Sequence, residues 1–120
     1  EIELESMSKN SLQLDSIDSV RANIESISLN KNQSIIVTLG STGVFINHAN
    51  KQEFIEGHNV EAIDTTGSGD CFLGALASSL VKNENLFDAA AYANKAAALS
   101  VTKKGASASM PTHQDVLKYL

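Results

Sequence analysis

The stretch Asp64-Thr65-Thr66-Gly67-Ser68-Gly69-Asp70 joins a short apolar run to a periodic apolar segment through a glycine-rich turn. Residues 60–63 predict a strand before this turn, and apolar residues at helical spacing predict a helix over 68–81 after it. Small residues in the turn let backbone N–H groups approach an anion, and a helix start adds its partial positive charge. The stretch therefore predicts a phosphate site at Gly67, Ser68 and Gly69.

Asp70 falls in the first turn of this predicted helix. A carboxylate held beside a bound phosphate can contact an attacking hydroxyl of the substrate and accept its proton, as in protein kinases. The pattern thus favours phosphoryl transfer with Asp70 as catalytic base and substrate contact. A plain strand-to-helix turn, with Asp70 as a partner of the helix dipole, remains the alternative from spacing alone.

Other glycine-rich phosphate motifs do not fit this turn. A Walker A loop requires Lys and then Ser or Thr after its last glycine, where this chain has Asp70 and Cys71. A dinucleotide-binding fingerprint requires a third glycine where Phe72 stands, and a nucleophile elbow requires a glycine where Thr66 stands.

Residues 64–76 resemble the C-terminal signature of the ribokinase-like (PfkB-type) carbohydrate kinases, Asp-Thr-x-Gly-Ala/Ser-Gly-Asp followed by a helix of small residues. Three further segments, 35–45, 91–94 and 100–111, resemble other parts of that family in the same order. The resemblance implies an α/β fold with three α/β/α layers and a mostly parallel sheet. This chain would be its C-terminal, nucleotide-binding part.

Family members are more than twice as long as these 120 residues, so we expect residues 1–120 to be a C-terminal fragment of a single PfkB-type kinase domain. The opening Glu1-Ile2-Glu3-Leu4 resembles the middle of the family's Asn-x-x-Glu motif. That resemblance implies that Glu1 is associated with Mg²⁺. The fragment alone is expected to be inactive, because the sugar-binding half would lie upstream.

The nucleotide site is expected in two places. Thr38, Gly40, Ser41 and Gly43 end an apolar strand, and ligands gather at the carboxyl ends of strands in α/β sheets. A plain hairpin turn explains the same residues, and only the resemblance implies a contact with ATP. Asn94 could hydrogen-bond adenine, or it could cap or satisfy the backbone in an Ala-rich helix.

The resemblance also implies a monovalent cation, K⁺, beside the phosphate turn. Its ligands would be the Asp64 carboxylate, the Ser109 hydroxyl and four backbone carbonyls, those of Thr66, Ser100, Lys103 and Gly105. Oxygen-rich ligation suits a hard cation. The histidines, His48, His58 and His113, have no metal-ligand spacing and are expected at the surface.

Composition limits the class of protein. Apolar residues make up 42% of the chain, the formal net charge is −5, and Cys71 is the single cysteine. The acidic balance argues against a nucleic-acid partner, and no apolar run approaches the ~20 residues of a membrane helix. We expect a cytoplasmic protein with no membrane partner, and the resemblance implies a homodimer when the protein is full length.

The remaining segments predict ordinary elements. A helix capped by Asp15 or Ser16 should run to residue 30, and residues 34–39 read as a buried parallel strand. Residues 44–46 and 53–55 predict a hairpin, and small residues predict a helix over 87–101. A last helix should follow the capping pair Thr112 and Asp115.

The function expected from these residues is ATP-dependent phosphorylation of a primary hydroxyl of a small sugar, with Mg²⁺ and K⁺. Ribose, converted to ribose 5-phosphate, is the expected substrate. Kinases of another sugar or a nucleoside, such as fructose or adenosine, are alternatives. A non-catalytic nucleotide-binding fragment is a further alternative, although such a module has no need of Asp70.

Overall fold

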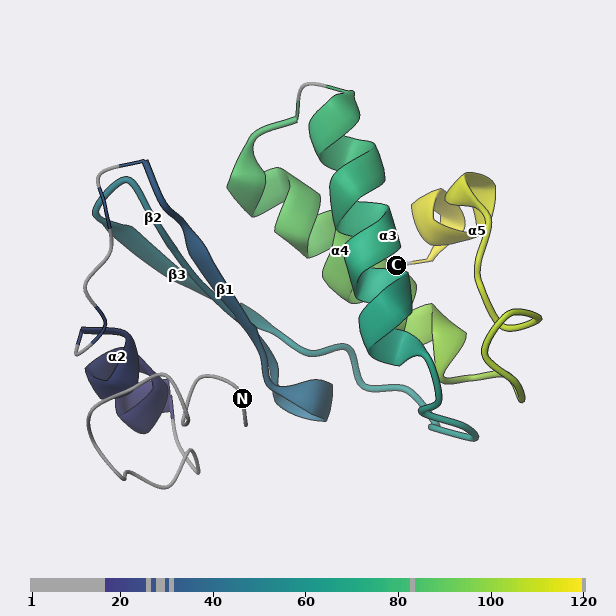
Figure 1. Cartoon of the computed structure of the whole chain (residues 1–120). Coiled ribbons are helices and arrows are strands. Elements are labelled where there is room, and N and C mark those ends of the chain that lie inside the picture. The colour runs from purple at the N-terminus through teal and green to yellow at the C-terminus, as the bar shows by residue number, and fades with distance from the viewer. Residues whose placement is uncertain (1–16, 26, 28–29, 31, 83, 120) are drawn as a thin grey trace. The chain divides into compact units, whose positions relative to one another are not determined.

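The computed structural model describes residues 17–25, 27, 30, 32–82 and 84–119. The chain divides into two compact units, Glu1–Ile55 and Glu56–Leu120. The first holds α2 and a small sheet, and the second holds three helices (Figure 1). Glu1 and the predicted cap residues Asp15 and Ser16 lie outside the described residues.

In the first unit, helix α2 (Ile17–Glu25) packs on a three-stranded sheet in the order β1-β2-β3. The strands are β1 (Ile35–Thr38), β2 (Gly43–His48) and β3 (Lys51–Glu56). The spacing of apolar residues explains the core: Val20 and Ile24 share one face of α2 and meet Val37, Leu39 and Phe45. The predicted helix is confirmed, although its regular part ends at Glu25.

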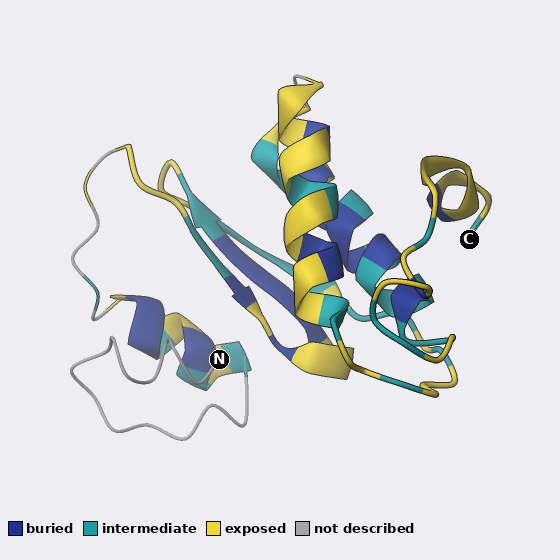
Figure 2. Cartoon of the chain, turned by 45° about the vertical axis from the view of Figure 1, so that its right-hand side comes forward, coloured by how far each residue is buried: buried dark blue, intermediate teal, exposed yellow. Residues whose placement is uncertain are grey.

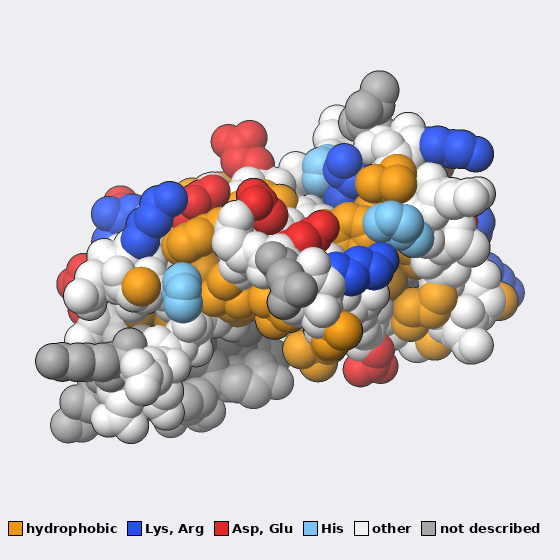
Figure 3. Space-filling model, turned by 90° about the horizontal axis from the view of Figure 1, so that it is seen from above, with side chains coloured by type: hydrophobic (Ala, Val, Ile, Leu, Met, Phe, Trp, Pro, Cys, Tyr) orange, Lys and Arg blue, Asp and Glu red, His pale blue; other side chains and the backbone are white. Residues whose placement is uncertain are grey.

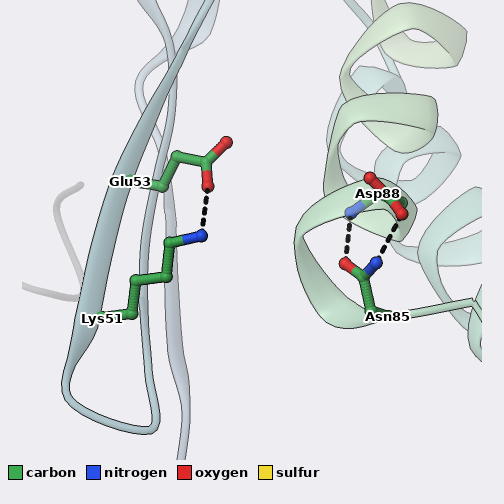
Figure 4. Close-up of polar contacts among 4 residues, drawn as sticks. All are labelled: Lys51, Glu53, Asn85 and Asp88. Carbon is green, nitrogen blue, oxygen red and sulfur yellow. Dashed lines mark hydrogen bonds and ion pairs between the residues drawn. The ribbon is translucent and has the colours of Figure 1, made fainter.

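The hairpin predicted in this unit is confirmed as β2 and β3. The turn between them contains Ala49 and Asn50, both at positive φ (51° and 62°), as a two-residue hairpin turn requires. Within β3, Lys51 and Glu53 form an exposed ion pair at 3.7 Å (Figure 4).

Within the described residues, β1 has no parallel partner of the kind predicted for residues 34–39. β1 runs antiparallel to β2 in a register that sets Val37 opposite Phe45. The short 3-10 helix η1 (Gly40–Thr42) explains this pairing, because it reverses the chain directly after β1 and brings the next strand alongside.

The second unit consists of α3 (Ser68–Val81), α4 (Leu86–Ser100) and α5 (His113–Lys118). α3 and α4 lie side by side, and α5 contacts α4 (Figure 1). Their shared core contains Cys71, Ala96 and Val116, and small buried residues such as Ala89 and Ala93 let helices approach closely. All three predicted helices are confirmed within a residue or two at each end.

The strand predicted over residues 60–63 is wrong. These residues form no strand, and Ile63 is 66% exposed. Among the described residues, no strand pairs with them. Instead, the N–H groups of Ile63 and Asp64 donate to the Val101 carbonyl at 2.7 and 3.1 Å. The segment is therefore fixed by the C-terminal end of α4 rather than by a sheet.

Burial is uneven along α3. Figure 2 shows exposed residues over much of its length, while α4 is mainly buried or half-buried. The apolar residues Leu73, Leu80 and Val81 are 64%, 40% and 83% exposed, whereas Cys71 and Phe72 are buried. The first turn of α3 is thus packed into the unit, whereas the apolar side chains of Leu73, Leu80 and Val81 are exposed to solvent.

Candidate active site

The glycine turn, residues 67–70, forms the start of α3. Gly67 is the N-cap residue at φ 78°, in the left-handed region that glycine adopts without a Cβ clash. Because glycine has no side chain, this helix start has no side-chain cap. Ser68 N donates to the Thr65 carbonyl at 3.2 Å, and within the described residues the next N–H groups, those of Gly69 and Asp70, have no acceptor. An anion is the acceptor that a helix start favours.

The other two helices of this unit are capped by side chains. Asn85 Oδ1 accepts a hydrogen bond from Asp88 N at 2.9 Å, and the Asn85 amide nitrogen donates to the Asp88 carboxylate (Figure 4). Thr112 and Asp115 form the predicted capping box, in which Thr112 N donates to Asp115 Oδ2 at 2.8 Å. The glycine turn therefore differs from both, because no side chain caps the start of α3.

Asp70 lies in the first turn of α3 with an exposed side chain. Within the described part of the chain, no hydrogen bond or ion pair occupies its carboxylate. The next two residues are buried, so the helix is fixed immediately behind Asp70. This placement leaves the carboxylate accessible to a substrate hydroxyl at the same helix end as the uncapped N–H groups.

Cys71 is a packed residue rather than a reactive one. It is 6% exposed and packs with Ala96 and Val116. Burial raises the pKa of its thiol, which keeps the sulfur protonated near neutral pH.

Asp64 joins the segment before the turn to the α4–α5 loop, residues 101–111. Gly105 N donates to Asp64 Oδ2 at 2.9 Å, and Thr66 N donates to Oδ1 at 2.9 Å. The Gly105 bond and then the Thr66 bonds lower the pKa of this carboxyl below its ordinary value. The carboxylate is thus ionised at neutral pH, and it fixes the loop beside the turn.

Three of the predicted cation ligands, Asp64, Thr66 and Gly105, are therefore in direct contact. The other three lie at the end of α4 or in the α4–α5 loop: Lys103 N is 3.5 Å from Ser100 O, and the buried Ser109 hydroxyl donates to Ala106 O at 2.9 Å. A carboxylate has about four acceptor positions, and the bonds from Gly105 and Thr66 leave part of this capacity on Asp64 unused. These oxygen donors fit a hard monovalent cation.

The α4–α5 loop also touches the glycine turn. A Cβ built at Gly67 would lie 2.9 Å from Ala106 Cβ and 3.4 Å from Ala106 Cα. Sequence reasoning missed Ala106, since an alanine in an irregular loop belongs to no pattern. The close approach explains why position 67 needs glycine for space as well as for φ.

Asn94 is 6% exposed, and its side-chain nitrogen donates to the Glu56 carbonyl at 2.9 Å. This bond ties α4 to the segment that enters the second unit. The side chain thus satisfies a backbone carbonyl, but one outside the Ala-rich helix rather than in it as the sequence suggested. The adenine role stays a prediction.

The predicted nucleotide loop belongs to the first unit. Thr38, Gly40 and Ser41 are exposed, and Gly43 is buried. Gly40 and Gly43 have positive φ values of 56° and 132°, so both need glycine, and Leu39 N donates to Gly43 O at 2.8 Å across the turn. The loop is therefore a defined turn that presents three small polar or glycine residues to solvent.

The histidines each have a neighbour. His48 Nδ1 lies 2.6 Å from Ser34 Oγ, His113 Nδ1 lies 2.7 Å from Tyr92 Oη, and the ring of His58 meets that of Tyr119 edge-on. His48 and His58 are half-buried rather than fully exposed. Over the described residues, no three His, Cys, Asp or Glu side chains are grouped so that they could hold a metal ion.

A pocket of about 300 Å³ lies between the α4–α5 loop and α5. It is lined by Leu99, Thr102, Lys103, Ser109, Pro111, Asp115, Lys118 and Tyr119. Two lysines and one aspartate share this wall, so its charges partly cancel.

The surface carries charges of both signs. On the face in Figure 3, acidic side chains stand among the basic ones, and the described residues form no basic stripe there. None of the described helices has both the length and the apolar character needed to cross a membrane.

Comparison with known proteins places these features in a family. The chain is 42% identical over 88 residues to ribokinase of Haemophilus influenzae, covering 73% of this chain and 29% of the relative. It is 38% identical over 93 residues to fructokinase-1 of Oryza sativa subsp. japonica, covering 72% and 29%. The chain thus spans less than a third of the length of these curated relatives.

Solved structures of similar kinases match the fold of this chain. Arabidopsis thaliana ribokinase, complexed with ribose and ATP, matches 99% of this chain and 38% of its own with a TM-score of 0.83 and 27% identity. A candidate ribokinase II of Escherichia coli, in complex with ATP and Mg²⁺, matches 99% and 36% with a TM-score of 0.79 and 28% identity.

A double mutant of Vibrio cholerae fructokinase, bound to fructose, ADP and a potassium ion, matches 100% of this chain and 38% of its own with a TM-score of 0.79 and 29% identity. These neighbours establish the ribokinase-like α/β fold. The family model for pfkB carbohydrate kinases matches residues 1–113. This chain belongs to the pfkB family of carbohydrate kinases.

Proposed function

We propose that the polypeptide containing these residues transfers the γ-phosphoryl group of ATP to a primary hydroxyl of a small sugar, with ribose as the acceptor. The observation that carries the proposal is the start of α3, where uncapped N–H groups and the exposed Asp70 carboxylate occur together. The membership of the chain in a family of carbohydrate kinases supports this reaction class.

In this mechanism, Asp70 accepts the proton of the attacking sugar hydroxyl as the oxygen approaches phosphorus. The N–H groups of Gly67, Ser68 and Gly69 donate to the oxygens of the transferring phosphoryl group, where negative charge is spread in the transition state. The buried residues behind Asp70 keep base and donors fixed relative to each other. Mg²⁺, when bound with ATP, neutralises charge on the phosphates, and we assign Glu1 to its surroundings.

The nucleotide would contact Thr38, Gly40, Ser41 and Gly43 through its phosphates and ribose. The defined turn at these residues supports the assignment, because small exposed groups leave room for a ligand. Asn94 would approach adenine with the donor or acceptor capacity that its bond to Glu56 does not use.

A potassium ion would be held by Asp64, Thr66, Ser100, Lys103, Gly105 and Ser109. The support is the oxygen donor set and the direct contacts of Asp64 with Thr66 and Gly105. Such an ion would brace the α4–α5 loop, which abuts the glycine turn. The Vibrio cholerae neighbour was solved with a potassium ion, which agrees with this class of cofactor.

Ribose is preferred because several of the most similar relatives are ribokinases, but fructokinases match almost as well. Fructose is therefore the second candidate acceptor. We further propose that residues 1–120 are the C-terminal part of one kinase domain, that the protein acts as a homodimer, and that it is cytoplasmic. The share of the relatives' length that is matched supports the first of these.

The test uses the protein encoded by the complete reading frame that contains residues 1–120. Phosphoryl transfer from ATP is measured with ribose, fructose and adenosine, and 5-deoxyribose is the matched control because it lacks the primary hydroxyl. Transfer to ribose but not to 5-deoxyribose is the expected result. ATP binding without transfer to any acceptor would indicate a non-catalytic nucleotide-binding protein instead.

A further inference from the structure

The glycine turn and the α4–α5 loop approach each other closely at Gly67 and Ala106. A Cβ at residue 67 would lie 2.9 Å from the Ala106 methyl group and 3.8 Å from Met110 Cε. Real Cβ atoms do not come this close, so a side chain at residue 67 would require the turn or the loop to shift. The glycine turn therefore packs against Ala106.

Ala106 is itself held from both sides. The preceding N–H, that of Gly105, donates to Asp64 Oδ2 at 2.9 Å. The Ala106 carbonyl accepts from the Ser109 hydroxyl at 2.9 Å, and Ser109 is 2% exposed. These two hydrogen bonds fix the backbone on either side of Ala106, so they also fix the position of its methyl group.

We propose that Ala106 is a positioning residue for phosphoryl transfer, whose methyl group sets the place of the glycine turn and, through it, of Asp70. The proposal rests on the proposed function. Gly67 begins α3 and Asp70 follows three residues later in the same helical turn, so a displacement of Gly67 moves the donor N–H groups and the base together. Ala106 touches neither substrate nor nucleotide in this account.

The size of the side chain at 106 is the testable variable. A valine adds two methyl groups to a side chain whose Cβ already stands 2.9 Å from the Cβ position of residue 67, whereas a glycine removes the contacting methyl group. A misplacement of about 1 Å at reacting groups lowers the rate by about 100-fold. Serine keeps the Cβ and adds one small atom, so it should preserve the contact.

The experiment measures kcat and the KM for ATP of Ala106→Val, Ala106→Gly and Ala106→Ser in the protein from the complete reading frame. Ala108→Val is the matched control, because Ala108 lies in the same loop, is exposed, and is 3.9 Å from the Cβ position of Gly105 rather than of Gly67. We expect kcat of Ala106→Val to fall by about 10- to 100-fold. The KM for ATP should stay within about threefold of wild type, since the adenine and ribose contacts lie elsewhere.

Ala106→Gly should lower kcat by a smaller factor, and Ala106→Ser and Ala108→Val should keep it. A folded Ala106→Val protein with wild-type kcat, or an equal loss in Ala108→Val, overturns the inference. If Ala106→Val does not fold, equal kcat values for Ala106→Gly, Ala106→Ser and wild type overturn it. A wild-type protein that transfers no phosphoryl group would overturn the proposed function first, which separates the two failures.

Discussion

Replacing Gly67 by alanine tests the geometry of the turn in two separable ways. The residue sits at φ 78°, and holding an L-residue in the left-handed region costs about 1–2 kcal/mol. The new Cβ would also meet Ala106 Cβ at 2.9 Å, and crowding of this kind costs about 1–3 kcal/mol. Gly67→Ala should therefore lower the free energy of unfolding by about 2–5 kcal/mol.

A second background separates the two contributions. In an Ala106→Gly protein the methyl group that the new Cβ meets is gone, so only the backbone contribution of about 1–2 kcal/mol should remain. Gly74→Ala is the matched control: a Cβ there meets nothing within 4 Å, and alanine in a helix should stabilise by about 0.5–1 kcal/mol. Denaturant unfolding of the four proteins, with wild type, gives the comparison.

A free energy of unfolding for Gly67→Ala within about 0.5 kcal/mol of wild type, the range of an ordinary surface change, would refute the contact between positions 67 and 106. The contact is also refuted if the loss is the same in both backgrounds, because Ala106 would then not be the group that the new Cβ meets.

Three further outcomes follow from the same unit. With Na⁺ replaced by K⁺ at constant ionic strength and saturating Mg²⁺ and ATP, activity should rise, and Asp64→Ala should lose that response; a wild-type rate indifferent to the ion would remove the cation site from the account. The lowered pKa values of Asp64 and Asp115 predict that their contribution to stability is fully present above the unfolded pKa of about 3.9 and is lost as pH falls through the folded values. Unfolding midpoints measured from pH 7 down to pH 2.5 should show a smaller acid loss in Asp64→Asn, and an unchanged profile would count against its two backbone bonds. Thr112→Ala should lower the free energy of unfolding by about 1 kcal/mol because α5 loses its cap, whereas Thr112→Ser should not, and equal stabilities would show that the capping box is dispensable.

Local patterns predicted the elements that depend on neighbouring residues. The apolar spacing after the glycine turn gave the bounds of α3, and the Thr112 and Asp115 pair gave the start of α5. Both are decided by side chains within one or two helical turns, which a sequence displays directly.

Features that depend on distant partners were not predictable in this way. Residues 60–63 have the composition of a strand, but the Val101 carbonyl takes the N–H groups of Ile63 and Asp64. β1 pairs antiparallel with β2 rather than in the parallel way expected, because η1 reverses the chain directly after it. Asn94 binds Glu56, 38 positions away, and Ala106 meets Gly67 across 39 positions, and neither contact leaves a periodic signal.

In the candidate site, too, local features could be predicted from the sequence and long-range contacts could not. The glycine turn and Asp70 could be identified from seven consecutive residues, because their spacing encodes a helix start. The contact of Asp64 with Gly105 required the fold, since it joins segments 41 positions apart. The sequence therefore predicts the turn, but it does not predict the long-range contacts that hold the turn in place.

The most direct measurement of the central claim is the single-turnover rate of phosphoryl transfer by Asp70→Asn, made alongside its affinity for ATP. Asparagine keeps the size and place of the side chain but cannot accept the proton of the sugar hydroxyl. The account predicts a rate at least ~100-fold below wild type with little change in ATP affinity, while the exposed-carboxylate control Glu61→Gln keeps the wild-type rate. Transfer by Asp70→Asn at close to the wild-type rate would contradict the account, because Asp70 would then not be the base.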